Sequence, residues 1–148
     1  MSASYEIRVL RLNEMPDAPK IDCPQQAHRY WQDVVAKMPW FIPDREVCVV
    51  LTLNTRYRVT GHSLVSVGTL NESIVAARDV FRPGVAMAAF ALVLMHCHPS
   101  GDPSPSEADH RITRRLSDAA GILQINLLDH IIVGLTPPWF SFKEAGVL

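Results

Sequence analysis

The chain has 148 residues and a formal net charge of −1. This length predicts one domain with a buried core, and the near-neutral charge gives no electrostatic argument for nucleic acid or an anionic membrane as partner. No apolar run reaches the roughly 18 residues that span a bilayer, and the N-terminus lacks the pattern of a secretory signal. The three cysteines are widely spaced and odd in number, which argues against a disulfide framework, so we expect a cytoplasmic protein.

The first part of the chain predicts a strand, a loop and a helix. Residues 5–12 are rich in strand-forming side chains, and the proline-bearing residues 13–20 are typical of a loop. A helix is predicted over about 24–37, because apolar residues recur there at helical spacing. Pro24 is tolerated in its first turn, and we interpret the helix as a packing element.

The middle of the chain predicts a group of antiparallel strands. Residues 47–53 form a continuous apolar run, which is typical of a strand covered on both faces. After a short turn, residues 57–60 and 62–70 are predicted as antiparallel partners. Gly61 and Gly68 indicate bulges or bends in that sheet.

A second helix is expected between about residues 78 and 90. Pro83 fits a helix only in its first turn, so this helix should begin later than Arg78. Its candidate core residues are Val80, Phe81, Val85 and Phe90.

The second half of the chain alternates strands with a helix. The apolar run 91–95 predicts a strand that leads into His96. A helix is predicted over about 106–121, with Gly121 as its C-terminal stop, and residues 125–128 and 130–133 form a last strand region. The tail, 139–148, suits a short strand or a helical turn. Because strands and helices interleave, we expect an α/β or α+β fold with a mixed sheet.

Three potential metal ligands fall between His96 and Asp109. His96 and His98 lie on one face if they end a strand, since strand side chains alternate. Asp109 lies three residues before Ile112 and therefore on the inner face of the next helix. A buried carboxylate costs several kcal/mol unless a cation or donors lie nearby. Two imidazoles and one carboxylate are the ligands of a catalytic zinc ion, with one position left for water.

Structural explanations exist for the same residues. A histidine at a strand end is commonly a hydrogen-bonded core or rim residue. Ser106 followed three residues later by Asp109 fits a helix capping box. His130, which follows Asp129 in a predicted strand, could support a metal ligand from behind or be a hydrogen-bonded sheet residue.

The spacing of these residues resembles a known family. His-x-His, seven residues, Ser, two residues and Asp is the pattern of the JAMM (MPN-type) metalloproteases, matched here by His96, His98, Ser106 and Asp109. The longer string HCHPSGDPSPSEAD, with LDHIIVG after it, is similar to the RadC branch of that family, as are LNTRYRV and VGTLN upstream. The likeness covers about residues 44–134, which we expect to be the motif-bearing core of a single domain over 1–148.

This resemblance implies a fold and a chemistry. The fold is a JAMM/MPN (cytidine-deaminase-like) architecture, a curved mixed β-sheet flanked by helices. The chemistry is water-mediated cleavage of peptide or isopeptide bonds at one Zn²⁺ held by the two histidines and the aspartate. Glu46 resembles the motif's general base, with Glu72 as the alternative candidate. Ser106 would donate a hydrogen bond to the oxyanion that forms during cleavage.

Cys97 departs from the pattern, because RadC proteins more often carry Asn between the two histidines. Strand alternation directs its side chain away from a metal held by its neighbours. We therefore interpret Cys97 as a buried, inert thiol, with a ligand role as the alternative.

Two other functions fit parts of the sequence. One is a DNA-repair-associated or protein-binding RadC-like module with a structural or vestigial metal site. The neutral charge and the lack of a full helix-hairpin-helix segment near the N-terminus argue against it. The other is a His-His-carboxylate iron oxygenase, whose sites commonly lie in all-β folds. We expect a peptide or isopeptide substrate and no membrane; the apolar tail at 139–142 leaves a homodimer open.

Overall fold

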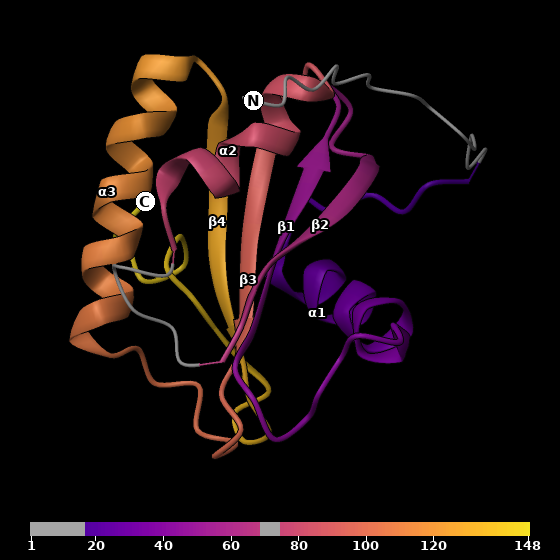
Figure 1. The fold of residues 1–148 in the computed structure, drawn as a ribbon, viewed down its shortest axis with the longest axis vertical. Helices are drawn as coiled ribbons and strands as arrows, with labels where there is room; N and C mark the ends of the chain where they lie inside the picture. Colours follow the sequence, from indigo (N-terminus) through magenta and orange to yellow (C-terminus); the bar gives the residue numbers. More distant parts are fainter. Residues whose placement is uncertain (1–16, 69–74) are drawn as a thin grey trace, which may run out of the picture.

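The structure, a computed structural model, describes residues 17–68 and 75–148 (Figure 1). The strand expected at 5–12 and the alternative base Glu72 lie outside these described residues. The helices and strands of the described part are α1 (Pro24–Asp33), the 3₁₀ turn η1 (Val35–Lys37), β1 (Val47–Leu53), β2 (Val59–Val67), α2 (Ala77–Ala86), β3 (Ala91–Cys97), α3 (Glu107–Leu123), β4 (Asn126–Val133) and β5 (Trp139–Ser141).

The described strands form one open sheet in the order β2-β1-β3-β4-β5. β1 is antiparallel to both β2 and β3, β3 is parallel to β4, and β5 is antiparallel to β4. Helix α1 covers one face of the sheet, while α2 and α3 cover the other (Figure 1). The expected class, a mixed α/β sheet flanked by helices, is therefore confirmed.

The two central strands are buried along their whole length, as the apolar runs predicted. Their side chains alternate between two apolar clusters, one on each face of the sheet. In β3, Val93 and Met95 pack on the α1 side, whereas Leu92 and Leu94 pack on the side of α2 and α3. The same alternation puts His96 on the α3 side and Cys97 on the α1 side. The strand thus determines which neighbours each of these two residues meets.

The expectation that Pro83 lies in the first turn of its helix is wrong. Helix α2 begins at Ala77, and Pro83 lies inside it. Proline has no N–H to donate to the preceding turn, but Val80, Phe81 and Gly84 of this helix are buried against the sheet side, and the helix ends three residues later. Tertiary packing therefore outweighs the local cost of proline.

Two of the expected core residues of this segment are wrong as well. Val85 is 58% exposed and Phe90 is 38% exposed, whereas Val80 and Phe81 are buried as expected. Because α2 begins before Pro83, its buried face is defined by positions 80, 81 and 84, and residue 85 faces solvent.

Other boundaries differ from the sequence-based expectation in detail. The helix predicted over 24–37 is interrupted at Val34, after which η1 follows. The two strand segments predicted on either side of Gly61 form the single strand β2, with irregular register at both ends of its pairing with β1. Helix α3 continues through Gly121 to Leu123, and the residue that caps its C-terminus, Gln124, adopts the left-handed conformation (φ 56°). Across residues 17–68 and 75–148, no helix is long and apolar enough to cross a membrane.

Candidate metal centre

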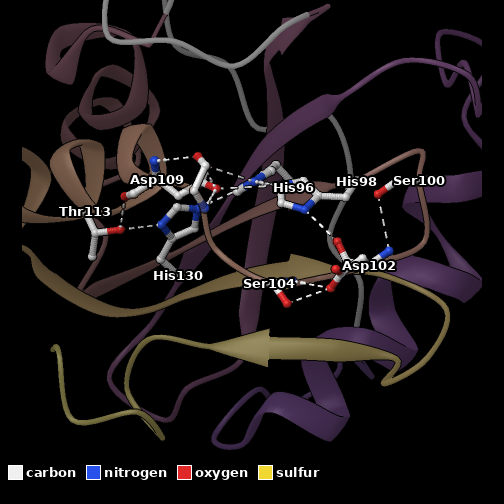
Figure 2. A network of polar contacts seen from close by, with 9 residues as sticks. His96, His98, Ser100, Asp102, Ser104, Asp109, Thr113 and His130 are labelled. Atoms are coloured by element: carbon white, nitrogen blue, oxygen red, sulfur yellow. Dashed lines mark hydrogen bonds and ion pairs between the residues drawn. The ribbon is translucent and has the colours of Figure 1, made fainter.

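Three side chains that can ligate a metal converge between β3 and α3 (Figure 2). His96 Nε2 lies 3.1 Å from His98 Nε2 and 3.3 Å from Asp109 Oδ1. His98 Nε2 lies 3.6 Å from Asp109 Oδ2. The structure therefore brings together the three residues that the motif singled out.

Local structure explains this convergence. His96 is the penultimate residue of β3 and His98 immediately follows the strand, so both imidazoles lie on the face that α3 covers. The chain then reverses through a loop in which Gly101 has a positive φ of 83°, a conformation that favours glycine. The loop packs against the end of β4, since a Cβ on Gly134 would come within 2.7 Å of the Gly101 carbonyl oxygen.

The loop also fixes the ring of His98. The His98 Nδ1 atom lies 2.8 Å from the backbone carbonyl oxygen of Asp102 (Figure 2). A carbonyl oxygen can only accept, so Nδ1 carries the proton and Nε2 faces the cluster. The Asp102 carboxylate in turn accepts bonds from the Ser104 N–H and hydroxyl, at 2.9 and 2.7 Å, which hold the turn in shape.

Asp109 is held at the third position of α3 by a capping box. Its Oδ2 accepts from the Ser106 backbone N–H and hydroxyl, both at 2.7 Å, while its own N–H donates to Ser106 Oγ at 3.1 Å. The capping explanation for Ser106 is therefore correct. It is also compatible with a metal site, because the box orients the carboxylate and leaves Oδ1 toward His96.

The electrostatics of the cluster favour an ionised aspartate. Burial alone would raise the pKa of Asp109, but the adjacent imidazoles of His96 and His98 and the backbone bond from Ser106 lower it well below its ordinary value. The hydrogen bond to Asp109 raises the pKa of His98, against the opposing effect of burial. Asp109 is therefore negatively charged at neutral pH and attracts a proton or a cation to this point.

The donor set fits a zinc ion. Ligands of a tetrahedral zinc with bonds of about 2.0–2.2 Å lie roughly 3.3–3.6 Å apart, and the three spacings here are 3.1, 3.3 and 3.6 Å. The side chains of His96 and Asp109 are 0% and 2% exposed, whereas that of His98 is 14% exposed. Solvent therefore reaches this cluster mainly at His98.

Glu46 lies close to this accessible side. It immediately precedes β1 and is partly buried, and it borders an open cleft that Pro99, the residue after His98, also lines. The Glu46 charge is one of the influences that raise the pKa of His98. Glu46 therefore lies in the neighbourhood of the candidate ligand His98, although fifty residues separate it from His96 in sequence.

Cys97 points away from the cluster, as strand alternation predicted. Its Sγ accepts from the Val47 N–H and donates to the Arg45 carbonyl oxygen, both at 3.4 Å. Burial raises the pKa of this thiol, which makes it unreactive. The thiol thus holds the backbone on both sides of Glu46, a contact that the sequence did not reveal.

Two further residues stand behind His96. Its Nδ1 lies 2.9 Å from His130 Nε2, and His130 Nδ1 lies 2.7 Å from Thr113 Oγ1 (Figure 2). His130 therefore contacts the candidate ligand His96 directly, and it is also a hydrogen-bonded sheet residue; both sequence-based interpretations fit this contact. Thr113 was missed; the available signal was a polar side chain four residues after Asp109, beside the apolar Ile112 on the buried face of α3.

The fold and this cluster define a class: a mixed α/β domain with a candidate metal centre of two histidines and one aspartate. A sequence model of the RadC-like JAB domain matches residues 21–147. The chain belongs to this family, as the motif predicted.

Several bacterial relatives carry similar sequences. The chain is 46% identical over 119 residues to a UPF0758 protein of Chlorobium luteolum, covering 79% of this chain and 53% of the relative. It is 50% identical over 104 residues to a UPF0758 protein of Trichlorobacter lovleyi, covering 70% and 45%. For a UPF0758 protein of Thermotoga maritima the identity is 38% over 137 residues, covering 93% and 58%. The chain therefore spans about half the length of the relatives that it matches.

Proposed function

We propose that this domain is a zinc-dependent hydrolase that cleaves peptide or isopeptide bonds. The observation that carries the proposal is the convergence of His96, His98 and Asp109 at spacings that suit a tetrahedral ion. Membership of the RadC-like JAB family supports it. A reducing, cytoplasmic setting is part of the same proposal, supported by the free thiols of Cys23, Cys48 and Cys97.

Each residue of the centre has a chemical task in this proposal. A zinc ion in such a site supplies a water whose pKa is about 7, and hence a nucleophile near neutrality. Glu46, on the accessible side of the cluster, accepts a proton from that water and returns it to the leaving amine. His96, His98 and Asp109 remain in place throughout, because each is held by a second hydrogen bond from the protein.

Ser106 is proposed as the donor to the oxyanion. Its hydroxyl proton points to Asp109 Oδ2 in the structure, so the hydroxyl must turn toward the substrate to act. The backbone N–H of Ser106 keeps its own 2.7 Å bond to the same oxygen, which holds the carboxylate when the hydroxyl turns. Ser106 is exposed, and an exposed hydroxyl can rotate at little cost.

The cleft beside Glu46 is proposed as the route for the substrate. Its volume is about 390 Å³, and Asp44, Arg45, Glu46, Gly68 and Pro99 line it. This volume is at the lower end of the range for small-ligand pockets, so the cleft suits a few residues of extended chain rather than a folded domain. A peptide tail or an isopeptide branch has that shape.

The test measures metal content and hydrolysis in the same samples. Zinc-loaded protein is assayed on a panel of peptides and isopeptide-linked conjugates, together with Glu46→Gln and the control Asp44→Asn. Both residues line the same cleft, so the pair separates general-base catalysis from local charge. We expect Glu46→Gln to lose about 10²–10⁴-fold in rate at full zinc occupancy, and Asp44→Asn to stay within about threefold.

Three other results of this test would contradict part or all of the proposed function. Full zinc occupancy without any hydrolysis would contradict the proposal and favour a DNA-repair-associated or protein-binding module with a structural metal. Equal loss in the two variants would remove Glu46 as the base. Occupancy by iron together with an oxygen-dependent reaction would favour an oxygenase instead.

A further inference from the structure

A continuous series of hydrogen bonds runs behind the candidate metal centre, from the Asp109 backbone to the His96 side chain (Figure 2). It begins at the backbone carbonyl of Asp109, 2.7 Å from Thr113 Oγ1. It continues from Thr113 to His130 Nδ1 at 2.7 Å and from His130 Nε2 to His96 Nδ1 at 2.9 Å. Thr113, His130 and His96 are all 0% exposed, so water does not compete for these bonds.

The direction of every hydrogen bond in this series follows from the Asp109 carbonyl oxygen at its start. A carbonyl oxygen can only accept, so the single Thr113 hydroxyl proton goes to Asp109. Thr113 Oγ1 must then accept from His130, which puts the proton of that ring on Nδ1. The His130 Nε2 atom is left as an acceptor, and His96 must donate to it from Nδ1. His96 Nε2 therefore has no proton and presents its lone pair to the cluster.

The reverse arrangement would block the centre. If His130 carried its proton on Nε2, His96 Nδ1 would have to accept, and the His96 proton would move to Nε2. That proton would occupy the position from which a metal must be bound. A doubly protonated His130 would have the same effect, because it too would donate from Nε2 to His96 Nδ1.

We propose that Thr113 and His130 are positioning residues that hold His96 in the tautomer competent to bind a metal. The inference rests on the metal centre of the proposed function, but it concerns metal binding rather than hydrolysis. It also explains why buried polar residues occur on α3 and β4, where apolar neighbours such as Ile112 and Ile131 fill the core.

The first measurement is the tautomer itself. Long-range ¹H–¹⁵N correlation spectra of the metal-free full chain report which nitrogen of each histidine carries the proton. We expect His96 to be protonated at Nδ1 and His130 at Nδ1 in the wild type. A His96 ring protonated at Nε2 would overturn the proposal, whatever the metal affinity.

The second measurement is zinc affinity, determined by competition with a chromophoric chelator. Thr113→Val keeps the shape of the side chain but deletes the hydroxyl, and we expect it to bind zinc about 10–100-fold more weakly. Thr113→Ser restores the hydroxyl and should return affinity to within about threefold of the wild type. In the spectra, Thr113→Val should shift His96 toward Nε2 protonation.

Thr52→Val is the matched control. Thr52 is also buried (1% exposed), and its hydroxyl likewise donates to a backbone carbonyl, that of Gly61 at 3.2 Å. We expect this variant to bind zinc within about threefold of the wild type. If Thr52→Val weakened zinc binding as much as Thr113→Val, or if Thr113→Val bound zinc like the wild type, the positioning role would be wrong.

The hydrolase proposal and the positioning role of Thr113 and His130 can be contradicted independently of each other. A protein that binds zinc with the expected tautomer but cleaves nothing would contradict the hydrolase proposal and leave the positioning role intact. A wild type that binds no zinc would contradict the hydrolase proposal, while the spectra would still decide the tautomer.

Discussion

At the scale of single residues, Asp109 has two tasks that other proteins give to different side chains. It is the third residue of the α3 capping box and the only carboxylate in the candidate metal cluster of the described residues. One oxygen, Oδ2, faces Ser106, and the other, Oδ1, lies nearest His96. The same side chain therefore links the start of a helix to the metal centre.

Substitutions of Asp109 should separate these tasks. Asp109→Ala removes both, so we expect it to lose zinc and also about 1 kcal/mol of stability from the lost cap. Asp109→Asn keeps a side-chain oxygen for the Ser106 N–H but loses the charge, so it should lose zinc with a smaller effect on folding. Metal analysis and denaturant unfolding of the metal-free proteins measure the two effects. Full zinc occupancy in Asp109→Ala would remove this residue from the ligand set.

Zinc affinity should depend on pH through His98. The hydrogen bond to Asp109 raises the pKa of His98 above its ordinary value of 6.5, so the metal-free protein binds this proton more tightly than an isolated imidazole does. Zinc must displace it. As pH falls through the raised pKa, we expect affinity to fall by up to about tenfold per pH unit for one displaced proton. Competition titrations at several pH values test this, and an affinity that did not change would contradict it.

Low pH has the opposite effect on the stability of the metal-free protein: protonation of His98 raises its free energy of unfolding. Because the folded state holds the His98 proton more tightly than the unfolded chain, this group stabilises the metal-free fold below the unfolded pKa of about 6.5. That contribution is lost as pH rises through the folded-state value. Acidification therefore favours the protonated, metal-free form, because the proton that stabilises this form is the same proton that zinc must displace.

At the scale of elements, β3 serves both faces of the sheet at once. His96 contacts α3 through Asp109 on one face, while Cys97 holds the backbone at Arg45 and Val47 on the other. Glu46 lies between these two backbone contacts. The strand that supplies the metal ligands therefore also positions the segment that carries the proposed base.

Replacing Cys97 should reveal this second contact. Cys97→Ala leaves the buried Val47 N–H without its partner, which costs about 1–3 kcal/mol, and it frees the segment around Glu46. We expect a lower hydrolysis rate with unchanged zinc content, and a smaller effect in Cys97→Ser, which keeps a donor and an acceptor. Cys48→Ala, a buried thiol in the apolar cluster on the α3 face, is the control for lost volume alone. Loss of zinc in Cys97→Ala would instead support the ligand role.

Two glycines, one within α3 and one immediately after β4, make a matched test of packing. Gly121 lies within α3, and a Cβ there would meet nothing within 4 Å. Gly121→Ala should therefore stabilise the protein by about 0.5–1 kcal/mol. Gly134→Ala should destabilise it by more than that, because its Cβ would lie 2.7 Å from the Gly101 carbonyl oxygen. The melting temperatures of the two variants test this prediction. Equal changes would show that the loop around Gly101 can shift to accommodate the added Cβ without loss of stability.

The sequence predicted correctly those elements whose pattern of apolar and polar residues reflects their burial in the fold. Residues 47–53 and 91–95 are almost entirely apolar because helices cover both faces of the sheet there. The ligand motif is readable because its spacing is local to one strand and one helix. Pro83 and Gly121 were misleading because packing of α2 and α3 outweighs the local preferences of both residues. Cys97 and Thr113 could not be assigned partners, since these depend on strand register and helix docking.

At the scale of the whole molecule, the candidate metal centre lies on elements that are packed into an extensive apolar core. Two apolar clusters, one on each side of the sheet, hold β3 and α3 in place. Small zinc-folded domains lack such a core and unfold when the ion is removed. In this protein the ligands are attached to elements that are stable for other reasons.

Removal of the ion should therefore leave the fold intact. After treatment with a strong chelator, we expect the circular dichroism spectrum to keep its helix and strand signal, and the melting temperature to fall by only the linkage contribution of zinc binding. Adding zinc back should restore both the metal content and the melting temperature. Unfolding on chelation would show that the ion is structural.

The capping box at Ser106 and Asp109 has a consequence for how the protein could be controlled. Because two hydrogen bonds within its own helix turn hold Asp109 Oδ2, we expect the carboxylate to keep its position whether or not an ion is bound. Loading then becomes a simple equilibrium with the surrounding pool of free zinc, rather than an event of folding. The fraction of active molecules would then rise and fall with the concentration of free zinc, and each folded molecule could gain and lose the ion repeatedly.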